Sequence, residues 1–282
     1  MRKVGLVIDS AFDLIDEVSN GLLVEVARMN IIVDGVSFVD GTEITLKDVI
    51  EASEAGKKVT TSQPSPEAYK TAYDNLKAQG VTDVVVMTVS RVLSGSYQSA
   101  ELAKELVEDL NVVLVNSKTS AMGGELLVAE VKEMFLNNED VALIKEKMDA
   151  LVEVSNVLLT IDDLGTLYRG GRMNKTQSFI GTLMKIKPII TVNQVGNLEL
   201  IDKVRTSKRV VSYMIDRINS SLDNVDKLHV RIGHIMSIET AKEIKAKILE
   251  TFENAKVVIS NEITPVVAVH LGKGGFGVSW VS

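Results

Sequence analysis

The sequence predicts an α/β fold of two domains, the first of them built on a parallel sheet. Two observations predict it. Short runs of Val, Ile and Leu recur along the chain, and amphipathic segments of helical length separate them. Most of these runs are continuous rather than alternating, which is typical of strands buried on both faces of a parallel sheet. In open sheets of this kind, ligands bind beyond the carboxyl ends of the strands.

The predicted elements alternate along the chain. The strands are Val4–Ile8, Asp83–Val89, Val112–Val115, Val157–Ile161, Ile189–Val192, His229–Ile232, Val257–Ile259 and Val266–His270. The helices are Ser65–Ala78, Tyr97–Asp109, Gly124–Leu136, Val141–Leu151, Lys208–Ser220 and Ser237–Asn254. The first helix has the clearest boundaries, because Ser65 is placed to cap it, Pro66 occupies its first position and Gly80 follows its end.

The pattern changes after the helix that ends near Leu151. A new strand begins at Val157, a Gly-rich basic segment follows at 164–175, and residues 191–198 resemble a hairpin. We therefore predict a domain boundary near residue 156, with an N-terminal α/β domain of residues 1–156 and a smaller α/β domain of residues 157–282. The chain has no Pro- or Ser-rich linker there, so we expect the two domains to pack closely.

Composition excludes several classes of function. The formal net charge of −7 argues against a nucleic-acid partner, which needs clustered positive charge. The absence of cysteine excludes disulfides, thiolate catalysis and Cys-based metal sites. The apolar run at the N-terminus stops at Asp9, too early for a signal peptide, and no run approaches the roughly 18 apolar residues of an integral membrane segment. We therefore expect a cytoplasmic protein.

Two loops rich in hydroxyl groups are candidates for holding an anion. The first, residues 60–66, contains Thr61 and Ser62, whose hydroxyls can donate to an anion without adding charge. The second follows the predicted strand at 83–89 and enters a helix at Ser94 and Gly95, where backbone N–H groups attract anions. An ordinary polar loop with a helix cap explains either sequence equally well. A nucleophilic Ser94 is disfavoured because Gly-x-Ser-x-Gly is missing.

Three charged or titratable groups stand beside turns or strand ends. Arg172 follows paired glycines, and its guanidinium matches a carboxylate or phosphate, although a plain surface loop remains open. His270 ends a predicted strand and precedes a glycine-rich loop, with a structural histidine as the alternative. Asp9, at the end of the first strand, either enters a site or caps the next helix. The pair Asp162 and Asp163 lacks spaced partners, so we predict no metal site.

Taken together and in order, nine short motifs resemble those of the DegV family. They are Val7–Ser10, Asp40–Thr45, Thr61–Ser65, Leu93–Ala100, Asn116–Lys118, Gly170–Arg172, Ile186–Ile189, Lys203–Thr206 and His270–Gly272. Each is weak alone, but they span nearly the whole chain, and nine in the correct order are highly specific. One departure is Lys273, which stands where the family usually carries Pro.

The resemblance implies the two-domain DegV-like (EDD) fold, with a long-chain fatty acid in an apolar tunnel between the domains. It implies that the carboxylate meets hydroxyls of the two loops, at Thr61, Ser62 and Ser94, with Gly95 in the second loop. It ties Arg172 and His270 to phosphotransfer by a separate kinase of the FakA type. The expected protein is then a carrier for phospholipid synthesis, with no cofactor and no enzymatic activity of its own.

Two other functions remain open from the residues. The chain could be an enzyme acting on a small phosphorylated metabolite, with the loops at Ser94 and Gly272 holding phosphate. It could also be a regulatory protein that senses a lipid. Against the enzyme, no His-Asp or paired-Glu constellation stands beside these loops in the sequence.

Overall fold

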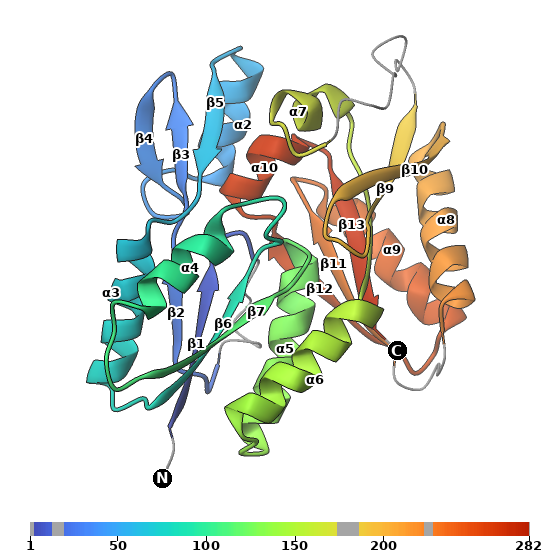
Figure 1. The fold of residues 1–282 in the computed structure, drawn as a ribbon. Helices are drawn as coiled ribbons and strands as arrows, with labels where there is room; N and C mark the ends of the chain where they lie inside the picture. The colour runs from blue at the N-terminus through green and yellow to red at the C-terminus, as the bar shows by residue number, and fades with distance from the viewer. Residues whose placement is uncertain (1–2, 13–19, 174–185, 223–227, 282) are drawn as a thin grey trace.

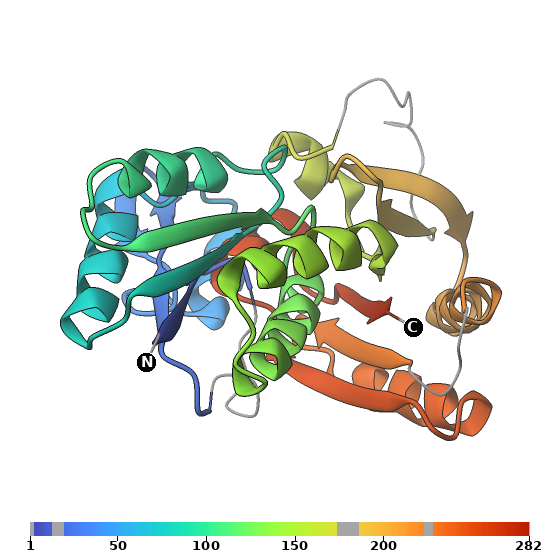
Figure 2. The ribbon, with the colours of Figure 1, turned by 60° about the horizontal axis from the view of Figure 1, so that its bottom comes forward.

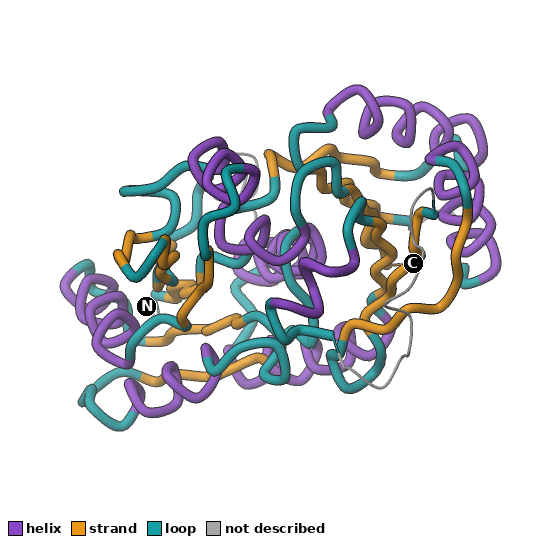
Figure 3. Tube along the Cα trace, turned by 90° about the horizontal axis from the view of Figure 1, so that it is seen from above, coloured by secondary structure: helices purple, strands orange, loops and turns teal. Residues whose placement is uncertain are grey.

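The computed structural model describes residues 3–12, 20–173, 186–222 and 228–281. Figure 1 shows two lobes side by side, each built on a sheet with helices against it. The strands of the first lobe all lie before residue 117, and those of the second lobe begin at residue 156. In Figure 3 the strands accordingly fall into two separate groups. The domain boundary near residue 156 stays a prediction.

The first sheet is fully parallel, as the continuous apolar runs predicted. Its order is β2 (Val24–Ala27), β1 (Val4–Asp9), β6 (Asp83–Thr88) and β7 (Asn111–Asn116). Alternate residues of β1 and β6 point to opposite faces, and both faces are buried. Helices α3 (Pro66–Ala78) and α4 (Ser96–Lys104) cover one face, and α5 (Met122–Leu136) and α6 (Val141–Val154) cover the other.

A small antiparallel sheet beside the first lobe was not predicted. It has the order β4 (Val36–Val39), β3 (Asn30–Val33) and β5 (Val59–Ser62), and α2 (Leu46–Glu54) contacts β5. These four-residue strands mix polar and apolar residues, so they lack the long apolar runs of the main sheet. The sheet places Thr61 and Ser62 at the end of a strand rather than in a free loop.

The second sheet has six strands and is mixed. Its order is β10 (Leu198–Val204), β9 (Lys187–Val192), β8 (Asn156–Thr160), β13 (Phe276–Val281), β11 (His229–His234) and β12 (Lys256–Glu262). Of its pairs, β11 with β12 is parallel, and the others are antiparallel. The predicted hairpin at residues 191–198 is present as the β9–β10 connection. Helices α8 (Ser207–Ser220) and α9 (Ile238–Thr251) pack on this sheet through aliphatic side chains.

The predicted strand Val266–His270 is wrong, because these residues form helix α10 (Pro265–Leu271). Pro265 occupies the first helical turn, where its missing N–H costs nothing. The helix contacts α2, β5 and α7 (Leu164–Arg169), so both flanks are covered, and its apolar run looks like that of a buried strand. His270 therefore lies on a helix rather than at a strand end.

Two helices connect the lobes. Helix α5 packs on β6 of the first sheet and on β11 and β13 of the second, and Figure 2 shows it with α6 between the lobes. Helix α10 belongs to the C-terminal half of the chain but contacts α2 and β5 of the N-terminal half, as Figure 1 shows. Within the described residues, no helix is both long and apolar enough to cross a membrane.

Candidate functional site

A cavity lies between the two lobes and includes about 870 Å³ of space free of protein atoms, part of it open to solvent. Most of its wall is aliphatic. Its apolar lining comes from Ala11, Met29, Val89, Leu93, Ala121, Met122, Val157, Leu159, Leu167, Val192, Leu198, Ile263, Val266, Val267, Leu271 and Phe276. We call this space the central cavity.

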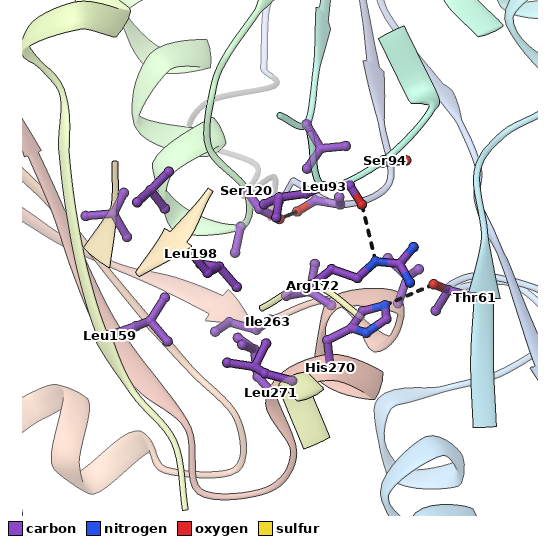
Figure 4. A pocket seen from close by; sticks show the side chains of 18 of the residues that line it. Thr61, Leu93, Ser94, Ser120, Leu159, Arg172, Leu198, Ile263, His270 and Leu271 are labelled. Atoms are coloured by element: carbon purple, nitrogen blue, oxygen red, sulfur yellow. Dashed lines mark hydrogen bonds between the residues drawn. The ribbon is translucent and has the colours of Figure 1, made fainter. Parts of the chain in front are cut away.

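The polar lining gathers toward one end of the central cavity. Thr61, Ser62, Ser94, Arg172 and His270 all line it, although they come from both halves of the chain. Figure 4 shows Thr61, His270 and Arg172 close together, with Leu159 and Leu198 on the opposite side of the view. The structure thus brings together five of the six predicted site residues. Their role in binding a ligand stays a prediction.

His270 and Thr61 form the central contact of the polar end. The Thr61 Oγ1 lies 2.9 Å from His270 Nε2, across 209 positions of sequence. Burial, together with the neighbouring Arg172 charge, lowers the pKa of His270 to about 4, so its imidazole is neutral at pH 7. A hydroxyl has one proton to give. If Thr61 donates to a ligand, it must accept from His270, which requires the tautomer with hydrogen on Nε2.

Arg172 ties the Gly-Gly-Arg turn to the loop that carries Ser94. Its Nε donates to the Leu93 carbonyl at 3.2 Å, and its Nη1 donates to the Gly170 carbonyl at 2.6 Å. Burial lowers the pKa of Arg172, but a guanidinium keeps its charge in proteins. These two contacts use two of its five N–H groups, so the remaining donors are available to an anion. Arg172 is the cation of the described cavity lining.

The buried carboxylate of Asp9 stabilises the loop that carries Ser94. Asp9 accepts hydrogen bonds from the Val89 amide (2.9 Å), the Ala11 amide (3.1 Å) and the Ser96 hydroxyl (2.5 Å). Burial raises the pKa of Asp9 to about 6, against the lowering effect of these hydrogen bonds. Asp9 is not among the described residues that line the cavity, and its interpretation as a cap of the next helix bears on residues outside the described ones. Asp9 is a support for the second loop.

Gly95 packs closely against the side chain of Gln63. A Cβ at this position would overlap the amide of Gln63, which itself lines the central cavity. Gln63 also donates to the Ser99 hydroxyl at 3.0 Å, so it connects the two hydroxyl loops. Close packing at Gly95 thus fixes the position of Ser94, whose hydroxyl accepts from the Ser96 amide at 3.2 Å.

Sequence reasoning missed several residues of the site. Gln63 and Ser120 line the polar part of the cavity, and Asp40 supports helix α10 by accepting from the Val266 amide at 3.1 Å. Gln63 and Asp40 lie within two of the family motifs, Thr61–Ser65 and Asp40–Thr45, so those motifs could have identified them. Ser120 lies in a turn whose next residue, Ala121, has a φ of 49°, and nothing in the sequence marks it.

The arrangement suits a molecule with one anionic end and a long apolar body. Of the described residues, those lining the cavity include no carboxylate. The described residues also contain no group of three or more His, Asp or Glu side chains placed to hold a metal ion. The fold and the site define an α/β protein with an amphipathic cavity between two lobes.

The chain belongs to the DegV family. The family described as "Uncharacterised protein, DegV family" matches residues 3–282. A DegV domain-containing protein of Listeria monocytogenes, lmo2514, is 34% identical over 285 residues, covering 99% of this chain and 98% of the relative. The predicted family is therefore confirmed.

Solved structures share the fold over the whole chain. A DegV family protein from Thermus thermophilus, described for its fatty acid binding, matches with a TM-score of 0.90 at 26% identity and covers 100% of both chains. The Streptococcus pneumoniae Fatty Acid Kinase (Fak) B3 protein, loaded with linoleic acid, matches with a TM-score of 0.88, covering 99% of each chain. At 21% identity, the second match shows the fold alone.

Proposed function

We propose that this protein binds one long-chain fatty acid in the central cavity and presents its carboxylate to a separate kinase. The observation that carries the proposal is the polarity of the cavity. Thr61, Ser94, Arg172 and His270 meet at one end of a mostly apolar wall, whose other polar residues are Ser62, Gln63, Ser120 and Thr160. The fatty acid binding described for the Thermus thermophilus relative supports the same ligand.

Energetics favour an amphipathic ligand over a small polar one. Each methylene buried in the aliphatic wall contributes about 0.8 kcal/mol, so a long acyl chain supplies on the order of 10 kcal/mol before association costs. Neutral hydroxyls of Thr61 and Ser94 can hydrogen-bond the carboxylate when water leaves. A small phosphorylated metabolite would leave most of the apolar wall without a partner.

The polar end also provides for a phosphoryl transfer. In the proposed reaction, a carboxylate oxygen attacks the γ-phosphorus of ATP held by the kinase, the bond to ADP breaks, and an acyl phosphate forms. In this proposal, the N–H groups of Arg172 that do not bond Leu93 or Gly170 stabilise charge on the transferring group. Neutral His270 contacts the Thr61 hydroxyl, so in this proposal it orients the attacking carboxylate oxygen, whereas the lipid itself is held by the wall and by Thr61 and Ser94.

A lipid-binding assay run beside a coupled phosphorylation assay tests this division of roles. With a FakA-type kinase and ATP, Arg172→Ala and His270→Ala should retain the lipid but lose most acyl-phosphate formation. Arg169→Ala is the matched control, because Arg169 is exposed on α7 and pairs with Asp163. If the two variants simply empty the cavity, the division is wrong. If both are phosphorylated normally, Arg172 and His270 have no part in transfer.

A further inference from the structure

A second hollow shares two of its lining residues with the central cavity. It is lined mainly by polar side chains of Ser117, Lys118, Thr119, Glu153, Ser155, Asn156, Thr191, Asn193, Gln194 and Arg217. We call it the polar cleft. Two residues, Val157 and Val192, line both the central cavity and the polar cleft. These two side chains therefore stand between an aliphatic chamber and a polar one.

Strand register places a third residue beside them. In the β8–β9 pair, Leu158 lies opposite Thr191 and Leu159 opposite Ile190, so the next step sets Val157 opposite Val192. On the other side of β9, Leu198 of β10 pairs with Val192. Val157, Val192 and Leu198 thus form one row across three neighbouring strands, and all three line the central cavity. We call this row the end wall.

The polarity of the lining also changes along a second segment of the chain. Along the segment between β7 and α5, Ser117, Lys118 and Thr119 line the polar cleft. The next residues, Ser120, Ala121 and Met122, line the central cavity. Apart from Ser120, which belongs to the polar lining of the central cavity, this segment also passes from polar to apolar lining within a few residues. In Figure 4, Leu198 lies on the side of Arg172 opposite to Thr61, so the end wall is on the side of the cavity away from Thr61.

The β9–β10 turn fixes the end wall against the first lobe. The Ser90 hydroxyl donates to the Gly196 carbonyl at 2.9 Å in a buried contact. Gly196 has a φ of 90°, and a Cβ there would overlap the Ser90 hydroxyl, so the turn sits directly on the first lobe. Within the turn, Asn193 Oδ1 accepts from the amides of Val195 and Asn197. The residues flanking this turn are Val192 and Leu198, so the end wall has little freedom to move.

We propose that the end wall sets the upper limit of acyl-chain length. The inference rests on the proposed function. Each methylene that remains inside the central cavity should raise affinity about fourfold. A methylene that passes the end wall would enter the polar cleft and gain nothing from burial. Val157, Val192 and Leu198 are then positions that determine which fatty acids this protein carries.

The test measures the affinity of each variant for the saturated fatty acids from lauric to arachidic acid. In the wild-type protein, affinity should rise with length and then level off. Val192→Ala removes two methyl groups from the end wall, so its plateau should move to acids longer by about two methylenes, with an affinity gain of roughly 15-fold there. Val192→Phe should move the plateau to shorter acids. Leu198→Ala, on a partly exposed edge strand, is the second opening variant.

Val267→Ala is the matched control, because Val267 lines the cavity on α10, three residues before His270. It should lower affinity for all lengths without moving the plateau. The inference is overturned if the plateau stays at one length in Val192→Ala, Val192→Phe and Leu198→Ala. It is also overturned if Val267→Ala moves the plateau as far as Val192→Ala does. Failure of the wild-type protein to bind any acid of the series would instead refute the proposed function.

Discussion

Replacing Thr61 with valine removes one hydroxyl from the polar end while keeping nearly the same side-chain volume. The lost group is the one that contacts His270 Nε2 at 2.9 Å and that we assign to the ligand carboxylate. A hydrogen bond to a charged group contributes about 1.5–3 kcal/mol. We therefore expect affinity for a long-chain fatty acid to fall by roughly 10- to 150-fold.

Thr60→Val is the matched control, because Thr60 is the exposed neighbour on the same strand and the chemical change is identical. Isothermal titration with oleate on both variants gives the comparison. The acyl-chain length at which affinity levels off should be the same in both variants, because neither substitution changes the end wall. Equal affinities in Thr61→Val and Thr60→Val would refute the assignment of Thr61 to the carboxylate.

Two further predictions concern the supports behind the site. Burial raises the pKa of Asp9 from 3.8 to about 6, so the folded state binds this proton more tightly than the unfolded state does. The contribution of the Asp9 proton to the free energy of unfolding is therefore fully present below about pH 4 and is lost as the pH rises through 6. Asn does not titrate, so the free energy of unfolding of Asp9→Asn minus that of the wild type should increase by about 3 kcal/mol between these two pH values. Denaturant titrations of both proteins across this pH range measure the difference. Unfolding free energies that change with pH in the same way in both proteins would contradict the prediction. Gly95→Ala should destabilise the fold by about 0.5–1.5 kcal/mol and weaken lipid binding, because the new methyl displaces the Gln63 amide from its hydrogen bond with Ser99. Gln63→Ala in the same chain should recover part of both losses, whereas Gly275→Ala, whose Cβ would meet its nearest neighbours at 3.5 Å, should have a smaller effect.

Much of the first lobe could be predicted from the sequence, because its strands are buried on both faces and their apolar runs are unbroken. Helix α10 could not, since a short run of Val and Ala that is buried by neighbours on both flanks has no helical period. The small sheet that carries Thr61 was missed for the opposite reason. Its strands are partly exposed and too short for a clear alternation.

The candidate site residues could be found because they stand in motifs, but their partners depend on three-dimensional packing. The contact between Thr61 and His270 joins two segments that no local pattern connects. The support of the Ser94 loop by Asp9 depends on β1 and β6 being neighbours in the sheet. The end wall follows from strand register, which turn geometry and burial decide together.

The structure also locates Lys273, the departure from the family pattern. Its Nζ lies 2.9 Å from Glu54 Oε1 at the end of α2, and both side chains are 56% exposed. An ion pair so open to solvent contributes little to stability. Lys273 thus joins the turn after α10 to the helix beside it.

Native mass spectrometry of the gently purified protein tests the central claim most directly. We expect a mass increase equal to one long-chain fatty acid per chain, or its appearance when oleate or palmitate is added to the stripped protein. Organic extraction of the same sample should release that acid. Protein that carries no lipid and takes up neither oleate nor palmitate, or that releases a phosphorylated metabolite instead, would contradict the account.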